Sequence, residues 1–231
     1  MLELDRLICG HSKKALLPPI SRTIEPGKII FLVGKNGAGK TTLLKTLAGL
    51  IEPIDGRVAH DERPIYLPAQ LTIADTLTGL DIHEIYGSGR PILPWQLPLH
   101  RAFAALSSGE QRQILLNATI SHRSPTILLD EPFNFLDLNH SLELIDALTA
   151  EAKKGRTIIV ATHHLDWIAR FRDTETWAFL DTPEKNTREL VTGETKSVLL
   201  SDAFQRAFDL HIQILKNPAG DGFALAISKR S

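Results

Sequence analysis

The stretch Gly34-Lys35-Asn36-Gly37-Ala38-Gly39-Lys40-Thr41 decides the fold of this chain. It fits the pattern G-x-x-x-x-G-K-[ST], in which the backbone N–H groups of a glycine-rich loop surround phosphate oxygens. Glycine is required because the backbone must come close to the anion in dihedrals that a Cβ would forbid. We expect Lys40 to reach the terminal phosphates and the Thr41 hydroxyl to ligate Mg²⁺.

The flanking residues supply the strand and the helix that such a loop needs. Residues 28–33 are apolar and rich in β-branched side chains, which predicts a buried strand, and residues 42–48 are rich in helix formers. A helix N-terminus adds the positive end of its dipole to the anion site, so this order predicts binding of a nucleoside triphosphate. A glycine-rich turn with a solvated lysine is the competing interpretation. The residues expected around the phosphates are Gly34, Asn36, Gly37, Ala38, Gly39, Lys40, Thr41 and Thr42.

Composition restricts the class of protein. The chain has 231 residues, 26 Lys and Arg against 27 Asp and Glu, and no run of five like charges, which argues against nucleic acid as the main partner. Cys9 is the only cysteine, so a reducing compartment fits. The N-terminus lacks the layout of a secretory signal, and no apolar run approaches the ~20 residues that span a bilayer. For work at a membrane, another chain must supply the spanning segments.

Strand and helix patterns alternate along the chain and predict an α/β fold with a mostly parallel sheet covered on both faces. Residues 1–33 read as strands and turns, and residues 52–56 as a turn. We divide the single domain into a core, a helical subdomain over residues 71–120, and a C-terminal helix and β-hairpin over residues 199–231. The ranges that predict strands are 64–67, 126–129 and 157–161, and those that predict helices are 109–120, 140–154, 201–208 and a segment from about Leu165.

Polar side chains follow three of the predicted strands. Asp130 and Glu131 come directly after a buried strand, and binding sites in open α/β sheets lie outside the carboxyl ends of the strands. Asp130 can ligate the divalent ion between the β- and γ-phosphates, and Glu131 can orient the attacking water and accept its proton. Gln70 and His163 can hydrogen-bond the γ-phosphate, the attacking water or the metal shell. Each of them is also typical of an ordinary polar turn.

Residues 106–112, with the sequence Leu-Ser-Ser-Gly-Glu-Gln-Arg, resemble the Leu-Ser-Gly-Gly-Gln signature of the ATP-binding cassette (ABC) ATPases. The resemblance covers nearly the whole chain, with the motifs in family order. It implies a P-loop NTPase core with an N-terminal antiparallel β subdomain and a short helical insertion. It also implies that two cassettes pair head to tail, so that Ser107 and Gly109 of one subunit face the ATP held by the phosphate loop of the other.

Single residues take roles from the same resemblance. Gln70 resembles the Q-loop glutamine, which also belongs to the Mg²⁺ shell, and Asp130 and Glu131 resemble the Walker B aspartate and the catalytic glutamate. Asp137 resembles the D-loop aspartate, and His163 the switch histidine. The residues expected to take part in catalysis are Lys40, Gln70, Glu131 and His163, and those expected to hold the metal are Thr41, Gln70 and Asp130.

The chain departs from the family pattern at several positions. Ser108 replaces a signature glycine, and Glu110 replaces the signature glutamine. Residues 134–135, Asn-Phe, replace the usual small pair before Leu-Asp. His11 stands where the family often has a tyrosine that stacks on adenine, and we assign it that position in the nucleotide site. An imidazole offers less area for stacking.

The resemblance implies an ATPase subunit of a membrane transporter. The expected partners are a second ABC ATPase subunit, with a homodimer favoured, and an integral permease, and a periplasmic or surface solute-binding protein stays open. ATP and Mg²⁺ are the expected cofactors, and the expected location is the cytoplasmic face of the inner or plasma membrane, peripheral through the permease. The tail is similar to that of iron-chelate and vitamin B12 importer ATPases. An exporter ATPase, a soluble cassette acting on nucleic acid or ribosomes, and a small-molecule kinase are the alternatives.

Overall fold

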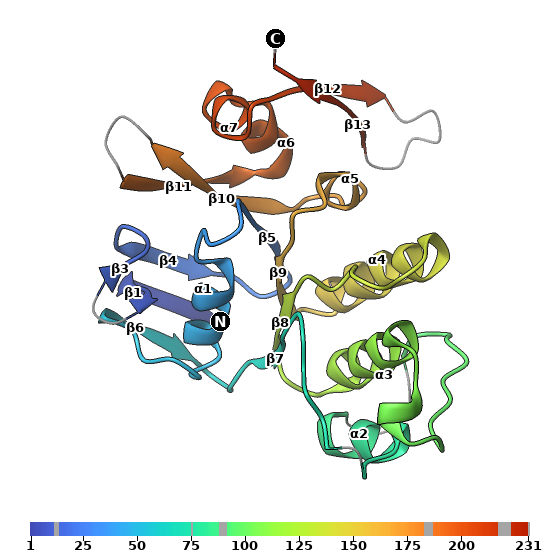
Figure 1. Cartoon of the computed structure of the whole chain (residues 1–231). Coiled ribbons are helices and arrows are strands. Elements are labelled where there is room, and N and C mark those ends of the chain that lie inside the picture. Colours follow the sequence, from blue (N-terminus) through green and yellow to red (C-terminus); the bar gives the residue numbers. More distant parts are fainter. Residues whose placement is uncertain (12–13, 75, 88–91, 183–186, 217–222, 231) are drawn as a thin grey trace.

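The computed structural model describes residues 1–11, 14–74, 76–87, 92–182, 187–216 and 223–230. A six-stranded sheet runs through the centre of the molecule in the order β11-β10-β5-β9-β8-β7 (Figure 1). Every neighbouring pair is parallel except β10 and β11, so the predicted mostly parallel sheet is confirmed. The strand bounds are β5 Ile29–Gly34, β7 Ile65–Leu67, β8 Thr126–Asp130, β9 Thr157–Ala161, β10 Glu175–Thr182 and β11 Thr187–Glu194.

A second, antiparallel sheet has the order β4-β1-β6 and lies beside the central one (Figure 1). Its strands are β1 Leu2–Ile8, β4 Ile20–Ile24 and β6 Asp55–His60, and β2 Gly10–His11 pairs with β3 Lys14–Ala15 next to it. The turn predicted at residues 52–56 is wrong at its end, because β6 already begins at Asp55. Gly56 has φ 77°, and a Cβ there would lie 2.2 Å from the carbonyl oxygen of Arg6, so the strands approach too closely for a side chain.

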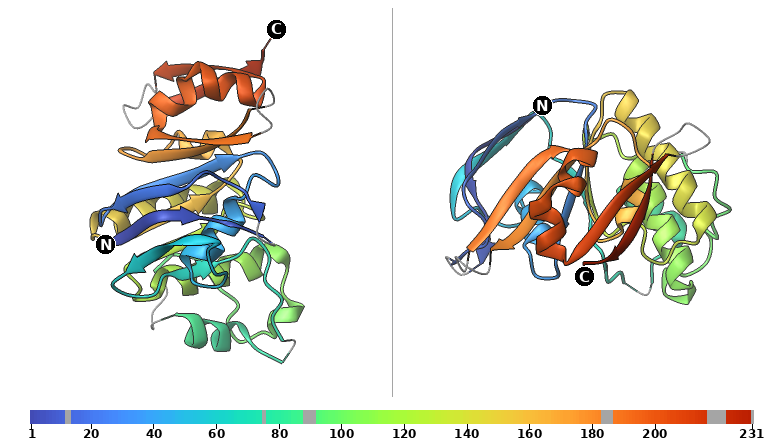
Figure 2. Two further views of the ribbon diagram at one scale, coloured as in Figure 1. Left: turned by 90° about the vertical axis from the view of Figure 1, so that its left-hand side faces the viewer. Right: turned by 90° about the horizontal axis from the view of Figure 1, so that it is seen from above.

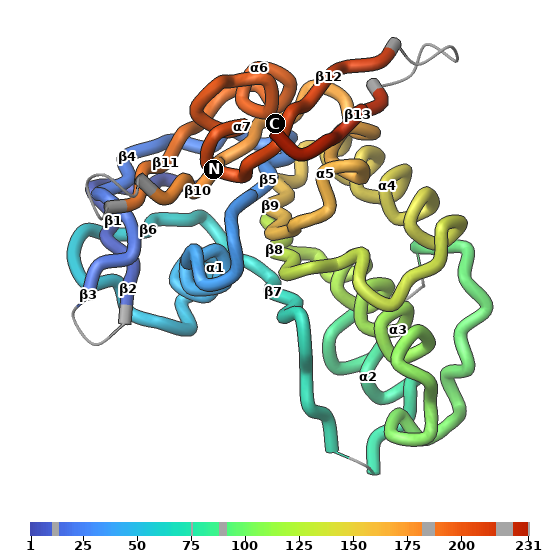
Figure 3. The backbone as a smooth tube through the Cα atoms, turned by 45° about the horizontal axis from the view of Figure 1, so that its top comes forward, coloured from blue at the N-terminus to red at the C-terminus, as the bar shows by residue number. Residues whose placement is uncertain are grey.

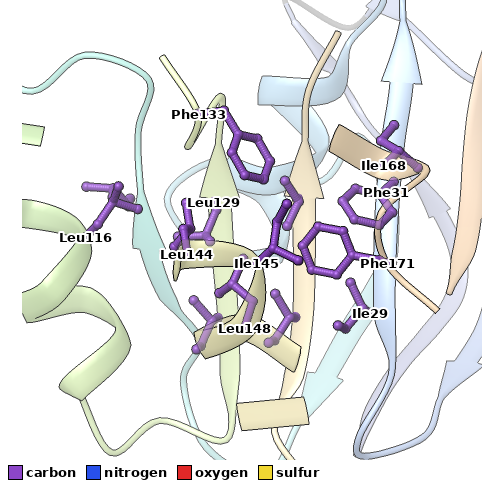
Figure 4. Packing of buried hydrophobic residues seen from close by; sticks show 14 of the residues in the cluster. Ile29, Phe31, Leu116, Leu129, Phe133, Leu144, Ile145, Leu148, Ile168 and Phe171 are labelled. Carbon is purple, nitrogen blue, oxygen red and sulfur yellow. The ribbon is translucent and has the colours of Figure 1, made fainter. Parts of the chain in front are cut away.

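Helices cover both faces of the central sheet. Helix α1 (Lys40–Leu47) lies between the two sheets, and α4 (Leu138–Lys153) and α5 (Leu165–Ile168) lie on the opposite face (Figure 1). Successive strand residues point to opposite faces. In β5, Phe31 therefore packs in the cluster that holds Leu144 of α4, whereas Leu32 packs in the cluster that holds Leu43 of α1. Figure 4 shows the α4 side of this core.

A helical lobe projects from the edge of the sheet after β7 (Figure 1). It contains α2 (Gly79–Tyr86), the short 3₁₀ helix Phe103–Ala105 and α3 (Ser108–Ser121). Ile82 and Ile114 of the lobe belong to the same apolar cluster as the α4 face of the sheet. The indole N–H of Trp95 also donates to Glu143 Oε2 of α4 at 2.6 Å. The lobe is thus joined to the core through both apolar packing and a hydrogen bond.

The C-terminal unit lies at the end of the molecule opposite the lobe (Figure 2). It comprises α6 (Thr195–Leu200), α7 (Asp202–Phe208), and the antiparallel pair β12 (Leu210–Lys216) and β13 (Phe223–Lys229). Phe204 and Ile212 connect it to the main core. No helix among the described residues is long and apolar enough to cross a membrane.

Candidate functional site

The loop from Gly34 to Lys40 joins β5 to α1 and leaves the start of that helix without a side-chain cap. Gly37 has φ 76° and Gly39 has φ 100°, conformations that favour glycine. A Cβ on Gly34 would lie 2.9 Å from Cβ atoms of Ala38 and Phe179. Because the first N–H groups of a helix have no intrahelical acceptor, this loop presents backbone donors and a positive dipole end to an anion.

Lys40 is the first residue of α1, directly after the loop, and is only 8% exposed. Its Nζ donates to the carbonyl oxygen of Gly34 at 2.7 Å and to that of Lys35 at 3.3 Å. Burial lowers the pKa of Lys40, while the carboxylates of Glu131 and Asp130 act in the opposite direction. The ammonium is therefore held beside the anion site by neutral carbonyl acceptors, which an anionic phosphate can replace.

Thr41 and Asp130 meet at the end of the loop although they are 89 residues apart. The Thr41 hydroxyl donates to Asp130 Oδ2 at 2.7 Å, and the Tyr66 hydroxyl approaches the same oxygen at 3.4 Å. Asp130 is 3% exposed, and burial raises its pKa. Thr41, Asp130 and Gln70 line one cavity of about 290 Å³. Hydroxyl, carboxylate and amide oxygens are ligands suited to a hard cation such as Mg²⁺.

Glu131 and His163 meet where β8 and β9 end. Glu131 Oε2 lies 2.9 Å from His163 Nδ1, but it is buried without an aligned hydrogen bond. Glu131 has φ 48°, and its backbone N–H donates to the carbonyl oxygen of Ala161 at 2.8 Å. A positive φ is strained for a residue with a Cβ, and such strain is common at functional sites. His163, with a side chain 54% exposed, can reach solvent or a ligand.

The His163 ring lies against that of His164, with centroids 4.0 Å apart. His164 Nε2 is 3.3 Å from Asn134 Oδ1, so the asparagine that departs from the family pattern has a partner. Burial lowers the pKa of His164, and the neighbouring His163 lowers it further. A neutral imidazole is therefore favoured at this position.

A second cavity of about 370 Å³ lies on the other side of the loop. Asn36 and His163 line it together with Phe208 and Leu210 of the C-terminal unit. The C-terminal unit thus borders the phosphate loop.

Ser107 and Gly109 lie at the start of α3, in the lobe apart from α1 (Figures 1 and 3). Glu110 closes a capping box, because its Oε2 accepts from the Ser107 N–H at 2.8 Å and from the Ser107 hydroxyl at 2.9 Å. A Cβ on Gly109 would lie 3.2 Å from the carbonyl oxygen of Phe135. The signature segment therefore contacts the chain before Asp137, and within one subunit it does not join the phosphate loop.

Three further residues were singled out from the sequence: Asp137, His11 and Thr42. Asp137 caps α4 by accepting from the His140 N–H at 2.8 Å. The side chain of His11 lies outside the described residues, so its stacking on adenine stays a prediction. Thr42 is buried on α1 beside the loop.

Two arginines near the site were missed by sequence reasoning. Arg112 of α3 is 4% exposed and donates to the carbonyl oxygens of Pro68, Asp130 and Glu131 at 2.9, 2.9 and 2.8 Å. Arg188 of β11 donates to Ala38 O at 3.0 Å. No local signal marks Arg112 as buried, because its neighbours Glu110, Gln111 and Gln113 are polar as well. No local signal points to Arg188, whose acceptor is 150 residues away in sequence.

Comparison with known proteins agrees with this geometry. Residues 17–82 match the family model described as ABC transporter. The chain is 30% identical to a hemin import ATP-binding protein of Rhodopseudomonas palustris (strain BisB5) over 91% of each chain. It is 26% identical to a probable siderophore transport system ATP-binding protein of Bacillus subtilis (strain 168), over 94% of this chain and 89% of that one. A solved structure of an inward-facing putative metal-chelate type ABC transporter shares the fold, with a TM-score of 0.81, 21% identity, and 99% and 98% of the two chains covered.

Proposed function

This chain belongs to the ATP-hydrolysing subunits of ABC transporters, and from that premise we propose that its transporter imports an iron chelate or hemin. The observation that carries the ATPase site is the 2.7 Å contact between Thr41 and Asp130 at the end of the phosphate loop. The names of the hemin and siderophore relatives support the cargo class. The single domain would use residues 71–120 as the subdomain that meets the permease.

The proposed mechanism depends on positioning and on charge. Backbone N–H groups of residues 34–42 and the Lys40 ammonium hold the triphosphate. Thr41, Asp130 and Gln70 would hold Mg²⁺, which neutralises charge on the β- and γ-phosphates when bound. Glu131 orients the water and accepts its proton.

The remaining groups complete the site from two directions. His163 donates to the γ-phosphate from the same subunit. Ser107 and Gly109 would come from a second subunit, because within one chain they lie in the lobe apart from α1. ATP binding thus closes the pair, and hydrolysis reopens it. A membrane permease would place the subunit at the cytoplasmic face, and a solute-binding protein would deliver the cargo.

The test of the site is Glu131→Gln. Removing the base should lower turnover by at least about 100-fold while ATP binding persists, and the ATP-loaded protein should run as a dimer in light scattering. Lys40→Ala should weaken nucleotide binding itself, and the exposed Glu62→Gln serves as the matched control. Steady-state hydrolysis retained in Glu131→Gln would refute the assignment.

The test of the cargo class is uptake into proteoliposomes that contain this subunit and its co-purifying permease. We expect ATP-dependent accumulation of hemin or of a ferric chelate. Accumulation of neither, or co-purification with ribosomes in place of a polytopic membrane protein, would refute the importer proposal without affecting the ATPase site.

A further inference from the structure

Two histidines and a glutamate meet at the carboxyl ends of β8 and β9. Glu131 follows β8, and His163 and His164 follow β9. One ligand atom from each residue lies within 4.8 Å of the other two, and the closest pair, Glu131 Oε2 and His163 Nδ1, is 2.9 Å apart. A tetrahedral ion with bonds of about 2.0–2.2 Å requires donors about 3.3–3.6 Å apart. Small side-chain rotations would therefore bring all three atoms onto one ion.

The cluster has the support that metal-binding histidines need. His164 Nε2 is 3.3 Å from Asn134 Oδ1, and with the amide oxygen as acceptor this nitrogen carries the proton. The other ring nitrogen, Nδ1, then keeps its lone pair for a ligand. Such outer hydrogen bonds orient the ring and raise its basicity.

The donor set identifies the class of ion. Two imidazoles and one carboxylate suit Zn²⁺ and its neighbours among the first-row transition metals. Mg²⁺ prefers oxygen ligands alone, which Thr41 and Asp130 offer at the adjacent position. Glu131 Oε2 is buried without an aligned hydrogen bond, whereas His163 is 54% exposed and leaves access for a water as the fourth ligand.

We propose that Glu131, His163 and His164 bind a Zn²⁺-like ion in the nucleotide-free subunit and thereby arrest ATP hydrolysis. The ion would bind the Glu131 carboxylate, which orients the attacking water, and the His163 imidazole, which meets the γ-phosphate. Arrest rests on the proposed function of these two residues, whereas metal binding does not. Lys40 and the loop glycines supply no ligand, so ADP binding should persist in the zinc-bound protein.

Zinc binding is tested by titrating the nucleotide-free protein with ZnCl₂ alone and measuring the heat of binding by calorimetry. We expect one saturable site. His164→Gln removes a ligand and should abolish that site, and Asn134→Ala should weaken it by about 10–100-fold, as loss of an outer hydrogen bond does. The exposed His100→Gln should bind as the wild type does. Retained ADP binding and unfolding midpoint show that each variant is folded.

The result that overturns the proposal is equal zinc affinity in the wild type, His164→Gln and His100→Gln, or absence of a saturable site in the wild type. Arrest is measured separately, as the Zn²⁺ concentration that halves each variant's own zinc-free ATPase rate. That concentration should rise at least about tenfold in Asn134→Ala. Zinc binding without arrest would refute the inhibitory part and would leave the metal site and the ATPase assignment intact.

Discussion

Arg112 joins the helical lobe to the parallel sheet, and its replacement by methionine tests that connection. Arg112 is 4% exposed, and its guanidinium donates to four backbone carbonyls: those of Pro68, Asp130 and Glu131 at 2.8–2.9 Å and that of Pro132 at 3.5 Å. Burial lowers the pKa of Arg112 to about 10, so the cation persists at neutral pH. The nearby carboxylates of Asp130 and Glu131 favour the charged form.

The magnitude follows from these contacts. A hydrogen bond to a charged group contributes about 1.5–3 kcal/mol, and part of the total is offset by several kcal/mol for taking the guanidinium out of water. Methionine keeps much of the volume but leaves the carbonyls without their donor. We expect Arg112→Met to lower the free energy of unfolding by about 3 kcal/mol, close to the lower value for removing one partner of a buried charge pair.

The assay is urea unfolding followed by circular dichroism, with thermal unfolding as a second measurement. For a chain of this size, 3 kcal/mol corresponds to a fall in Tm of about 6–12 °C. Arg123→Met, at an exposed position just after the same helix, should change the free energy of unfolding by less than about 0.5 kcal/mol. Equal unfolding midpoints for Arg112→Met and Arg123→Met would refute the conclusion that Arg112 joins the helical lobe to the sheet.

Two further substitutions test contacts that join distant parts of the chain. Arg188→Met removes the donor to Ala38 O and should raise the KM for ATP about tenfold with little change in kcat. Arg22→Met is the control variant. An unchanged KM in Arg188→Met would contradict the prediction. Burial raises the pKa of Glu151, but hydrogen bonds from Lys154 and Arg156 outweigh it and the net shift is downward. Its stabilisation is thus full above the unfolded pKa near 4.5 and is lost as pH falls through the folded pKa. Glu151→Gln should flatten the acid side of the unfolding profile, and an unchanged slope would be the contrary result.

Local sequence patterns predicted the elements that carry strong periodicity. The phosphate loop, the strand before it, α4 and the C-terminal hairpin each follow from short-range signals such as glycine positions and apolar spacing. Strands β10 and β11 were missed, and the helix expected from Leu165 has only four residues. The sequence of β10 mixes acidic and hydroxyl residues with apolar ones, and its place beside β5 is set by packing over residues far away along the chain.

The sequence by itself determined that a strand, a glycine loop and a helix follow one another at residues 29–47, because each depends on neighbouring residues alone. Only the tertiary structure decided which side chains meet. Asn134 contacts His164, Arg188 reaches Ala38, and Arg112 reaches four carbonyls, since strand order places those segments side by side. Local propensity determines that a segment forms a strand but not which strand it pairs with. The pairing in a parallel sheet depends on burying the apolar side chains of both faces together.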